Sequence, residues 1–263
     1  MRTINSTVMK LSLDRQEPKG THARISDCTQ GEAAWGGFFE RITRVAVKEA
    51  PLAIIDLTHT IAEDMPVYPG TEPPRLSDAS SIESDGFKET LLTMFSHTGT
   101  HMDPPAHIFE NGRTLDSFPV DFFTGCAVVV DCKDVPKGGL IGPERIERLG
   151  DAARESDFLL FNTGWDRFWG KPEYFGEYPC LSPGAVELIG QMELRGIGFD
   201  TIGIDPISDE ALSIHHTLLA KNMVFIENLT NLDKIGDRPF MLYALPMKWE
   251  ASDGAPVRAI AVI

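Results

Sequence analysis

Long hydrophobic runs and basic residues are both scarce in this 263-residue chain. No stretch approaches the roughly twenty apolar residues that a helix needs to cross a bilayer, so no transmembrane helix is expected. The 24 Lys and Arg residues are outnumbered by 39 Asp and Glu residues, which gives a formal net charge of −15. Because contacts to phosphate need a basic surface, this balance argues against binding to nucleic acid or to an anionic membrane. A small-molecule partner is the simpler expectation.

Cysteine is scarce as well. The chain has four, with no Cys-x-x-Cys spacing: Cys28, Cys126, Cys132 and Cys180. Four are too few for a disulfide framework in a chain of this length. We therefore expect reduced thiols in a cytoplasmic protein.

Residues 1–50 contain no apolar core of the kind that a secretory signal needs, so secretion is not expected. Within them, residues 33–49 place apolar side chains among charged ones at a spacing that suits a short amphipathic helix, and a partly disordered leader fits equally well. No linker or repeat interrupts the rest of the chain. We predict an N-terminal extension over residues 1–50 and a single domain over residues 51–263.

Several catalytic signatures are missing. There is no Gly-x-Ser-x-Gly elbow, no Walker loop and no EF-hand loop, and Gly196-Ile197-Gly198 lacks the third glycine of a dinucleotide-binding turn. Serine-hydrolase and nucleotide-binding functions are therefore disfavoured.

Short apolar runs bounded by Gly, Pro or Asp predict strands. They cover residues 52–57, 89–96, 127–131, 158–162, 201–205, 223–227, 240–245 and 257–263. Helices are predicted over residues 144–149, after Pro143, and from Ser182-Pro183 through Leu194, with a stop at Gly196. This interleaving indicates an α/β fold with more strands than helices.

The run from His97 to His107 holds three histidines and Asp103 within eleven residues. In an extended stretch, side chains two apart share a face, so His97, His101 and Asp103 would point the same way, with Gly99 leaving room for an ion. Imidazole and carboxylate are ligands of Zn²⁺ and Mn²⁺, and a set without thiolate is more typical of catalytic than of structural zinc. The alternative is a turn that happens to carry histidines.

This run reads His-x-Gly-Thr-His-x-Asp-x-Pro-x-His, which resembles the signature of the superfamily named Putative cyclase. That superfamily includes bacterial kynurenine formamidases (arylformamidases) and isatin hydrolases. Further matches are the spacing of His215 and Glu227 and the segments at residues 55–59 and 253–259, so the resemblance covers about residues 52–263. It implies a swivelling β/β/α domain with a mixed, partly closed sheet, whereas the βαβ rhythm alone suggests a doubly wound sheet. We expect the former.

The resemblance also implies roles for individual residues. Zn²⁺ or Mn²⁺, as one or two ions, would be bound by His97, His101, Asp103, His215 and Glu227. The family's general acid/base falls on His107, and a pKa near 6.5 suits an imidazole to that work. His216 is expected to be a neighbour rather than a ligand.

Candidate substrate contacts are aromatic. Tyr68 stands where kynurenine formamidases usually have tryptophan, which keeps a flat ring but changes its shape. Trp165, after a predicted strand, is a second candidate, although aromatic clusters more often belong to the core. Arg113 is a weaker candidate for a substrate carboxylate, because a solvated loop arginine explains it as well.

The expected function is therefore that of a metal-dependent amidohydrolase (EC class 3.5). It would cleave an aryl formamide such as N-formylkynurenine, a reaction of tryptophan catabolism, by attack of metal-bound hydroxide. A lactam-opening enzyme resembling isatin hydrolase is an alternative, and a non-enzymatic protein with a structural metal is a more distant one. The family suggests a homodimer or homotetramer.

Overall fold

The computed structural model describes residues 53–263. The predicted N-terminal extension, and the helix suggested within it, lie outside the described residues. The domain boundary predicted near residue 50 therefore stays a prediction.

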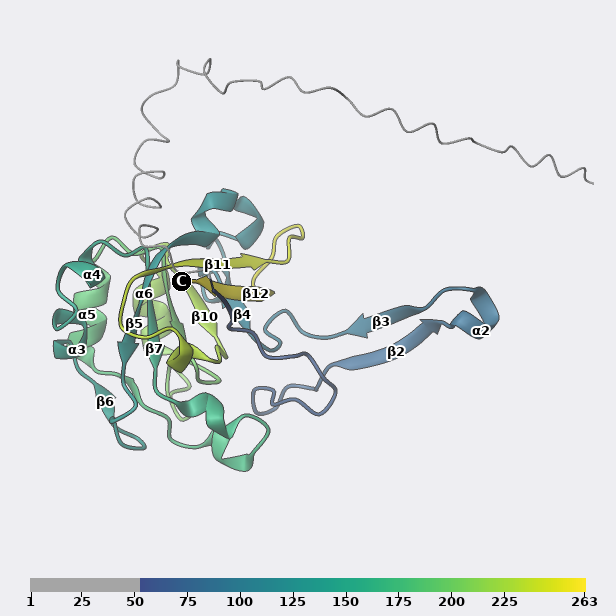
Figure 1. The fold of residues 1–263 in the computed structure, drawn as a ribbon, viewed down its shortest axis with the longest axis horizontal. Helices are drawn as coiled ribbons and strands as arrows, with labels where there is room; N and C mark the ends of the chain where they lie inside the picture. The colour runs from purple at the N-terminus through teal and green to yellow at the C-terminus, as the bar shows by residue number, and fades with distance from the viewer. Residues whose placement is uncertain (1–52) are drawn as a thin grey trace, which may run out of the picture. The chain divides into compact units, whose positions relative to one another are not determined.

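One large sheet organises the described chain (Figure 1). Its strands are β1 (Ile54–Asp56), β4 (His101–Asp103), β5 (Thr124–Asp131), β7 (Phe158–Asn162), β9 (Gly196–Phe199), β10 (Val224–Glu227), β11 (Phe240–Pro246) and β12 (Ala255–Val262). Two further pairs are β2 (Arg75–Ser80) with β3 (Glu89–Thr93), and β6 (Leu140–Ile141) with β8 (Cys180–Leu181). The α-helices are α2 (Ile82–Asp85), α3 (Glu144–Glu147), α4 (Asp151–Arg154), α5 (Pro183–Gln191) and α6 (Ser213–Leu219). Short 3-10 helices are η1 (Pro105–His107), η2 (Leu115–Ser117), η3 (Val120–Phe123), η4 (Trp165–Phe168), η5 (Pro172–Phe175) and η6 (Leu232–Lys234).

The large sheet is mixed and closes on itself. Its order is β1-β12-β11-β5-β7-β9-β10-β4, with parallel pairing from β5 through β10 and antiparallel pairing elsewhere. The sheet closes because Ala255 and Pro256 of β12, the strand next to the terminal strand β1, pair with Met102 and His101 of β4. The prediction of a mixed, partly closed sheet is confirmed.

Two hydrophobic cores lie on opposite faces of this sheet. In β5, Ala127 and Val129 belong to the core shared with β11 and β12. Val128 and Val130 belong to the other core, beneath α3 to α6. Because side chains alternate along a strand, a continuous apolar run supplies both faces, which is why the central strands lack the polar alternation of an exposed sheet.

The strand and helix predictions are largely correct, with one clear error. The Ser182 side chain accepts a hydrogen bond from Ala185 N, so α5 begins where predicted, but it ends at Gln191. The predicted strand at 201–205 is wrong, since β9 runs from Gly196 to Phe199 and residues 201–205 form bends. Glycine is needed at position 196 because a Cβ there would lie only 2.9 Å from Val224 Cγ2 of β10.

The β2–β3 hairpin, capped by α2, extends away from the large sheet (Figure 1). Leu76 pairs across it with Leu92, and all five residues of β3 are exposed. Both ends of the hairpin lead into segments that line the pocket described below. Among residues 53–263, no helix is both long and apolar enough to cross a membrane.

Candidate metal centre

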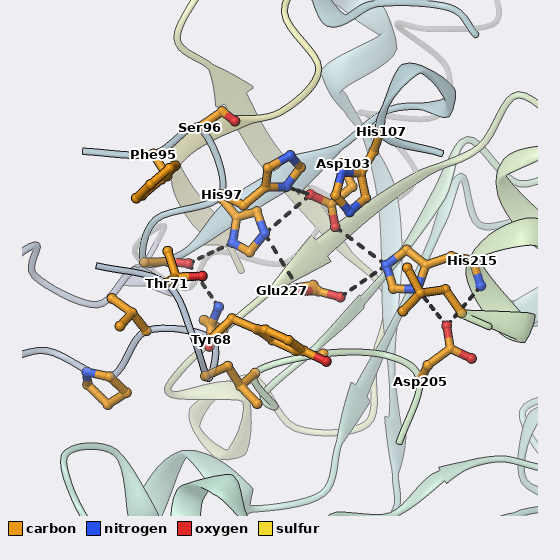
Figure 2. Close-up of a pocket in the computed structure, with 18 of the residues that line it drawn as sticks. Tyr68, Thr71, Phe95, Ser96, His97, Asp103, His107, Asp205, His215 and Glu227 are labelled. Atoms are coloured by element: carbon orange, nitrogen blue, oxygen red, sulfur yellow. Dashed lines mark hydrogen bonds and ion pairs between the residues drawn. The ribbon is translucent and has the colours of Figure 1, made fainter. Parts of the chain in front are cut away.

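Two adjacent strands and one helix bring the candidate ligands together (Figure 2). Strand β4 pairs antiparallel with β10, which sets His101 opposite Glu227. Within β4, Met102 points into one core, so His101 and Asp103 share the other face. Helix α6 covers that face and supplies His215.

His97 reaches the cluster by a different route from the one predicted. It lies in a bend before β4 rather than in an extended strand. Gly99, with φ of 67°, lies in the bent segment between His97 and β4. His97 Nδ1 then lies 2.5 Å from Asp103 Oδ1, and its Nε2 lies 3.5 Å from Asp253 Oδ2.

Asp103 stands at the centre of two overlapping triplets. The first joins His97, His101 and Asp103, and the second joins Asp103, His215 and Glu227, with the ligand atoms of each within 4.8 Å of one another. His101 Nε2 lies 3.2 Å from Asp103 Oδ1 and 3.6 Å from Glu227 Oε2. His215 Nε2 lies 3.6 Å from Glu227 Oε1 and 3.9 Å from Asp103 Oδ2. The structure therefore brings all five predicted side chains together, and their role as metal ligands stays a prediction.

Burial and mutual contact perturb every one of the four innermost groups. Burial would lower the pKa of His101, but the charges of Asp103 and Glu227 outweigh it and raise this pKa to about 9. Burial also works against His215, yet the carboxylates of Asp103 and Asp205 raise its pKa to about 10. Burial raises the pKa of Glu227 to about 7, and the charge of Asp103 adds to the rise. Asp103 is buried too, but the adjacent imidazoles hold its pKa well below the usual range.

The acidic neighbours therefore favour positive charge at the imidazoles of His101 and His215. A divalent cation would supply the same positive charge and displace protons from these rings. The donor set of three imidazoles and two carboxylates, gathered in one place, therefore fits Zn²⁺ or Mn²⁺. The shared Asp103 leaves room for one or two ions.

Hydrogen bonds behind the ligands orient two of the rings. His215 Nδ1 lies 2.6 Å from Asp205 Oδ2, and His101 Nδ1 lies 2.8 Å from the Gly99 carbonyl oxygen. Each bond leaves Nε2 facing the cluster, an arrangement typical of metal-ligating histidines.

Sequence reasoning missed Asp205. Its carboxylate also accepts the backbone N–H groups of Ile214 and His215, at 2.7 and 3.0 Å, so it fixes the start of α6 together with the ring. It lies ten residues before His215, outside the spacing of any helix cap, and no local pattern marks it.

A cavity of about 520 Å³ opens onto the cluster. Its walls include Pro66, Val67, Tyr68, Thr71, Phe95 and Ile202. Tyr68, the predicted substrate contact, lines this cavity and faces the cluster (Figure 2). Partial burial raises the pKa of its hydroxyl, and the charges of Glu227 and Asp205 add to the rise, so the phenol stays protonated.

His107 also lines this cavity. It is the last residue of η1, which begins at Pro105 directly after Pro104. The centroid of its ring lies 3.9 Å from that of His97 and 5.8 Å from that of His215. Burial lowers its pKa to about 4, because the pull of Asp103 is opposed by the other histidines. At neutral pH this imidazole is uncharged and able to accept a proton.

The other candidates lie elsewhere. Trp165 is not a pocket wall, which corrects the prediction: only 5% exposed, it packs with Tyr178 and donates from Nε1 to the Tyr174 carbonyl. Arg113 stacks over the Phe118 ring at 3.8 Å, away from the cavity. His216 packs against Phe109 and is outside both triplets, as expected of a neighbour.

Residues 55–206 match the family model described as Putative cyclase. The chain belongs to the cyclase family. Its curated relatives include the kynurenine formamidase of Salinibacter ruber, 30% identical over 212 residues that make up 80% of this chain and 97% of the relative. The kynurenine formamidase of Bacillus cereus strain ATCC 14579 is 31% identical over 208 residues, 78% of this chain and 95% of the relative.

The fold also recurs among solved structures. Isatin hydrolase A from Labrenzia aggregata, bound to benzyl benzoate, superposes with a TM-score of 0.73 at 25% identity, covering 88% of this chain and 99% of the other. A potential metal-dependent hydrolase with cyclase activity gives 0.67 at 28% identity, covering 80% and 98%. The family, the fold and the names of these relatives support a hydrolase that uses a metal.

Proposed function

We propose that this cyclase-family protein is a metal-dependent amidohydrolase that cleaves the C–N bond of an aryl formamide, with N-formylkynurenine as the first substrate to test. The observation that carries the proposal is one arrangement: four buried ligand-type side chains and the half-buried His97 converge, with His107 beside them, on a partly aromatic cavity. The kynurenine formamidase relatives support the choice of substrate class.

The ion would be held by His97, His101, Asp103, His215 and Glu227. Bound there, a divalent cation lowers the pKa of a water molecule and polarises a substrate carbonyl. Zn²⁺ and Mn²⁺ are both proposed because the ligand types suit both ions, with Zn²⁺ as the first to test.

His107 moves the proton. Its uncharged ring accepts a proton from the attacking water and then delivers it to the nitrogen of the breaking C–N bond. The balanced reaction consumes one water and releases formate and an arylamine. Tyr68 and Phe95 line the cavity beside the cluster, where a flat ring can pack.

A lactam is the second candidate substrate. Tyr68 replaces the tryptophan usual in kynurenine formamidases, and the fold superposes on an isatin hydrolase. Opening a cyclic amide uses the same attack, with the amine and carboxylate remaining in one product.

The test measures hydrolysis of N-formylkynurenine and of isatin by Zn²⁺- and Mn²⁺-loaded protein, with His107→Ala and His216→Ala run alongside. His216→Ala is the matched control, since it removes a neighbouring imidazole that lies outside both triplets. We expect His107→Ala to keep its metal and lose at least about a hundredfold in turnover. His216→Ala should stay within about threefold of the parent.

Each part of the proposal can fail separately. Turnover of isatin alone would move the substrate to lactams. Metal-loaded protein that turns over neither compound would overturn the proposed substrate classes, and protein that binds neither ion would overturn the metal centre. Full activity of His107→Ala would remove this histidine from the reaction.

A further inference from the structure

Asn228 connects the end of β10, which carries Glu227, to the segment that precedes His101. It follows Glu227 directly, is 4% exposed, and adopts a left-handed backbone with φ of 57°. Its N–H donates to the Thr201 carbonyl at 2.9 Å, and its own carbonyl accepts the Thr100 hydroxyl at 2.6 Å. The backbone at this residue therefore ties the end of β10 to the segment that precedes β4.

The Asn228 side chain makes a second connection. Nδ2 donates to the Gly99 carbonyl oxygen at 2.9 Å, and Oδ1 accepts the Tyr174 hydroxyl at 2.8 Å. Tyr174 is fully buried, and burial raises its pKa well above the usual range, so its hydroxyl remains a donor. The amide orientation of Asn228 is thereby set by a group that cannot ionise near neutral pH.

The Gly99 carbonyl is where this chain of bonds meets the cluster. It accepts from Asn228 and also lies 2.8 Å from His101 Nδ1. A carbonyl oxygen has two lone pairs, so both donors are accommodated and each restricts where the other can lie. A proton held on Nδ1 leaves Nε2, which faces Asp103 and Glu227, free to bind an ion.

We infer that Asn228 and Tyr174 are positioning residues of the metal centre, which act through the Gly99 carbonyl to hold His101 in its ligating tautomer and orientation. The inference rests on the proposed metal centre but not on the identity of the substrate. Neither residue belongs to the triplets or was marked by the ligand pattern in the sequence.

Two variants test the hydrogen bonds of Asn228 and of Tyr174 separately. Asn228→Gly removes the amide and keeps a residue that tolerates positive φ. Tyr174→Phe removes only the hydroxyl. Asn222→Gly is the matched control, because Asn222 has φ of 59° and is exposed, outside the cluster.

The measurements are Zn²⁺ affinity by competition with a chelator, ¹⁵N chemical shifts of the His101 ring in the Zn²⁺-loaded protein, and thermal unfolding of the metal-free protein. We expect Asn228→Gly to weaken Zn²⁺ binding by about 10- to 100-fold and Tyr174→Phe by at least about fivefold, as found when partners behind metal ligands are removed. The His101 ring nitrogen shifts should move in both variants. Asn222→Gly should match the parent.

A purely structural role predicts a different result: lower thermal stability with unchanged Zn²⁺ affinity and unchanged His101 shifts. That result in Tyr174→Phe, the milder change, overturns the inference even if Asn228→Gly fails to fold. A parent protein that binds no Zn²⁺ would instead count against the proposed metal centre itself.

Discussion

Gly254 should be intolerant of even one added methyl group, because it lies against a candidate ligand. A Cβ built on this buried glycine would stand 2.5 Å from His97 Nε2 and 2.8 Å from Nδ1. Ordinary contacts between such atoms are about 3.5–4.0 Å, so in Gly254→Ala the ring must retreat by roughly 1 Å. That movement pulls Nδ1 away from Asp103, to which it is now hydrogen-bonded.

Displacements of this size are costly at a reaction centre. A misplacement of about 1 Å can reduce turnover about a hundredfold, and overpacking typically lowers the free energy of unfolding by about 1–3 kcal/mol. We expect Gly254→Ala to bind Zn²⁺ about 10- to 100-fold more weakly, as judged by chelator competition, and to lose activity in proportion.

Gly190→Ala is the matched control for this prediction. Gly190 lies in α5, and its added Cβ would meet Leu218 and Lys221 at ordinary distances of 3.7 and 3.9 Å. It should raise the free energy of unfolding by about 0.4–1 kcal/mol and leave Zn²⁺ affinity unchanged. If Gly254→Ala binds Zn²⁺ as tightly as the parent, the reasoning from His97 is refuted.

Three further predictions concern residues around the site and in the core. Asp205→Asn should weaken Zn²⁺ binding about 10- to 100-fold, since it removes the charged acceptor of His215 Nδ1; equal affinity in a chelator titration would contradict this. Burial raises the pKa of Asp200 to about 6 from 3.8, so the folded protein holds this proton more tightly than the unfolded chain does. The free energy of unfolding should therefore fall by about 2 kcal/mol as pH rises from about 4 to about 6. In Asp200→Asn, the free energy of unfolding measured by thermal unfolding should change less with pH over that interval. A pH dependence equal to the parent's would contradict the raised pKa of Asp200. Burial raises the pKa of both Cys132 and Cys180 to about 12, so neither should react with iodoacetamide at pH 8 in the folded protein; peptide mass mapping that finds either one modified as fast as a free thiol would exclude this protonation state.

The sequence predicted best what is encoded within a few neighbouring residues. Continuous Val, Ile, Leu and Phe runs marked β5, β7 and β10 because both faces of these strands are buried. The candidate ligands His97, His101 and Asp103 could be recognised from the sequence because they lie within a run of eleven residues. The fold class and the family it resembled are confirmed, while the ligand roles remain a proposal.

What could not be predicted depends on tertiary contact. Strand β9 was misplaced because Gly196 resembles a helix stop, and only the close approach of β10, Leu160 and Leu229 explains Gly196 and Gly198. Asp205 and Asn228 act on imidazoles that fold next to them, through partners that no local spacing reveals. Trp165 was misassigned because a buried and a pocket-lining aromatic look alike in sequence.

The pairing of β4 with β12 relates the completion of the candidate metal centre to the order in which the chain is synthesised. All five candidate ligands precede residue 228, but the strand that flanks His101 on its other side, and the glycine against His97, come only at residues 254–256. A nascent chain that has emerged from the ribosome only as far as β11 therefore carries every ligand beside an open sheet edge. Ion capture should accordingly await the last described strand, which makes loading with metal a late event, coupled to closure rather than to the appearance of the ligands.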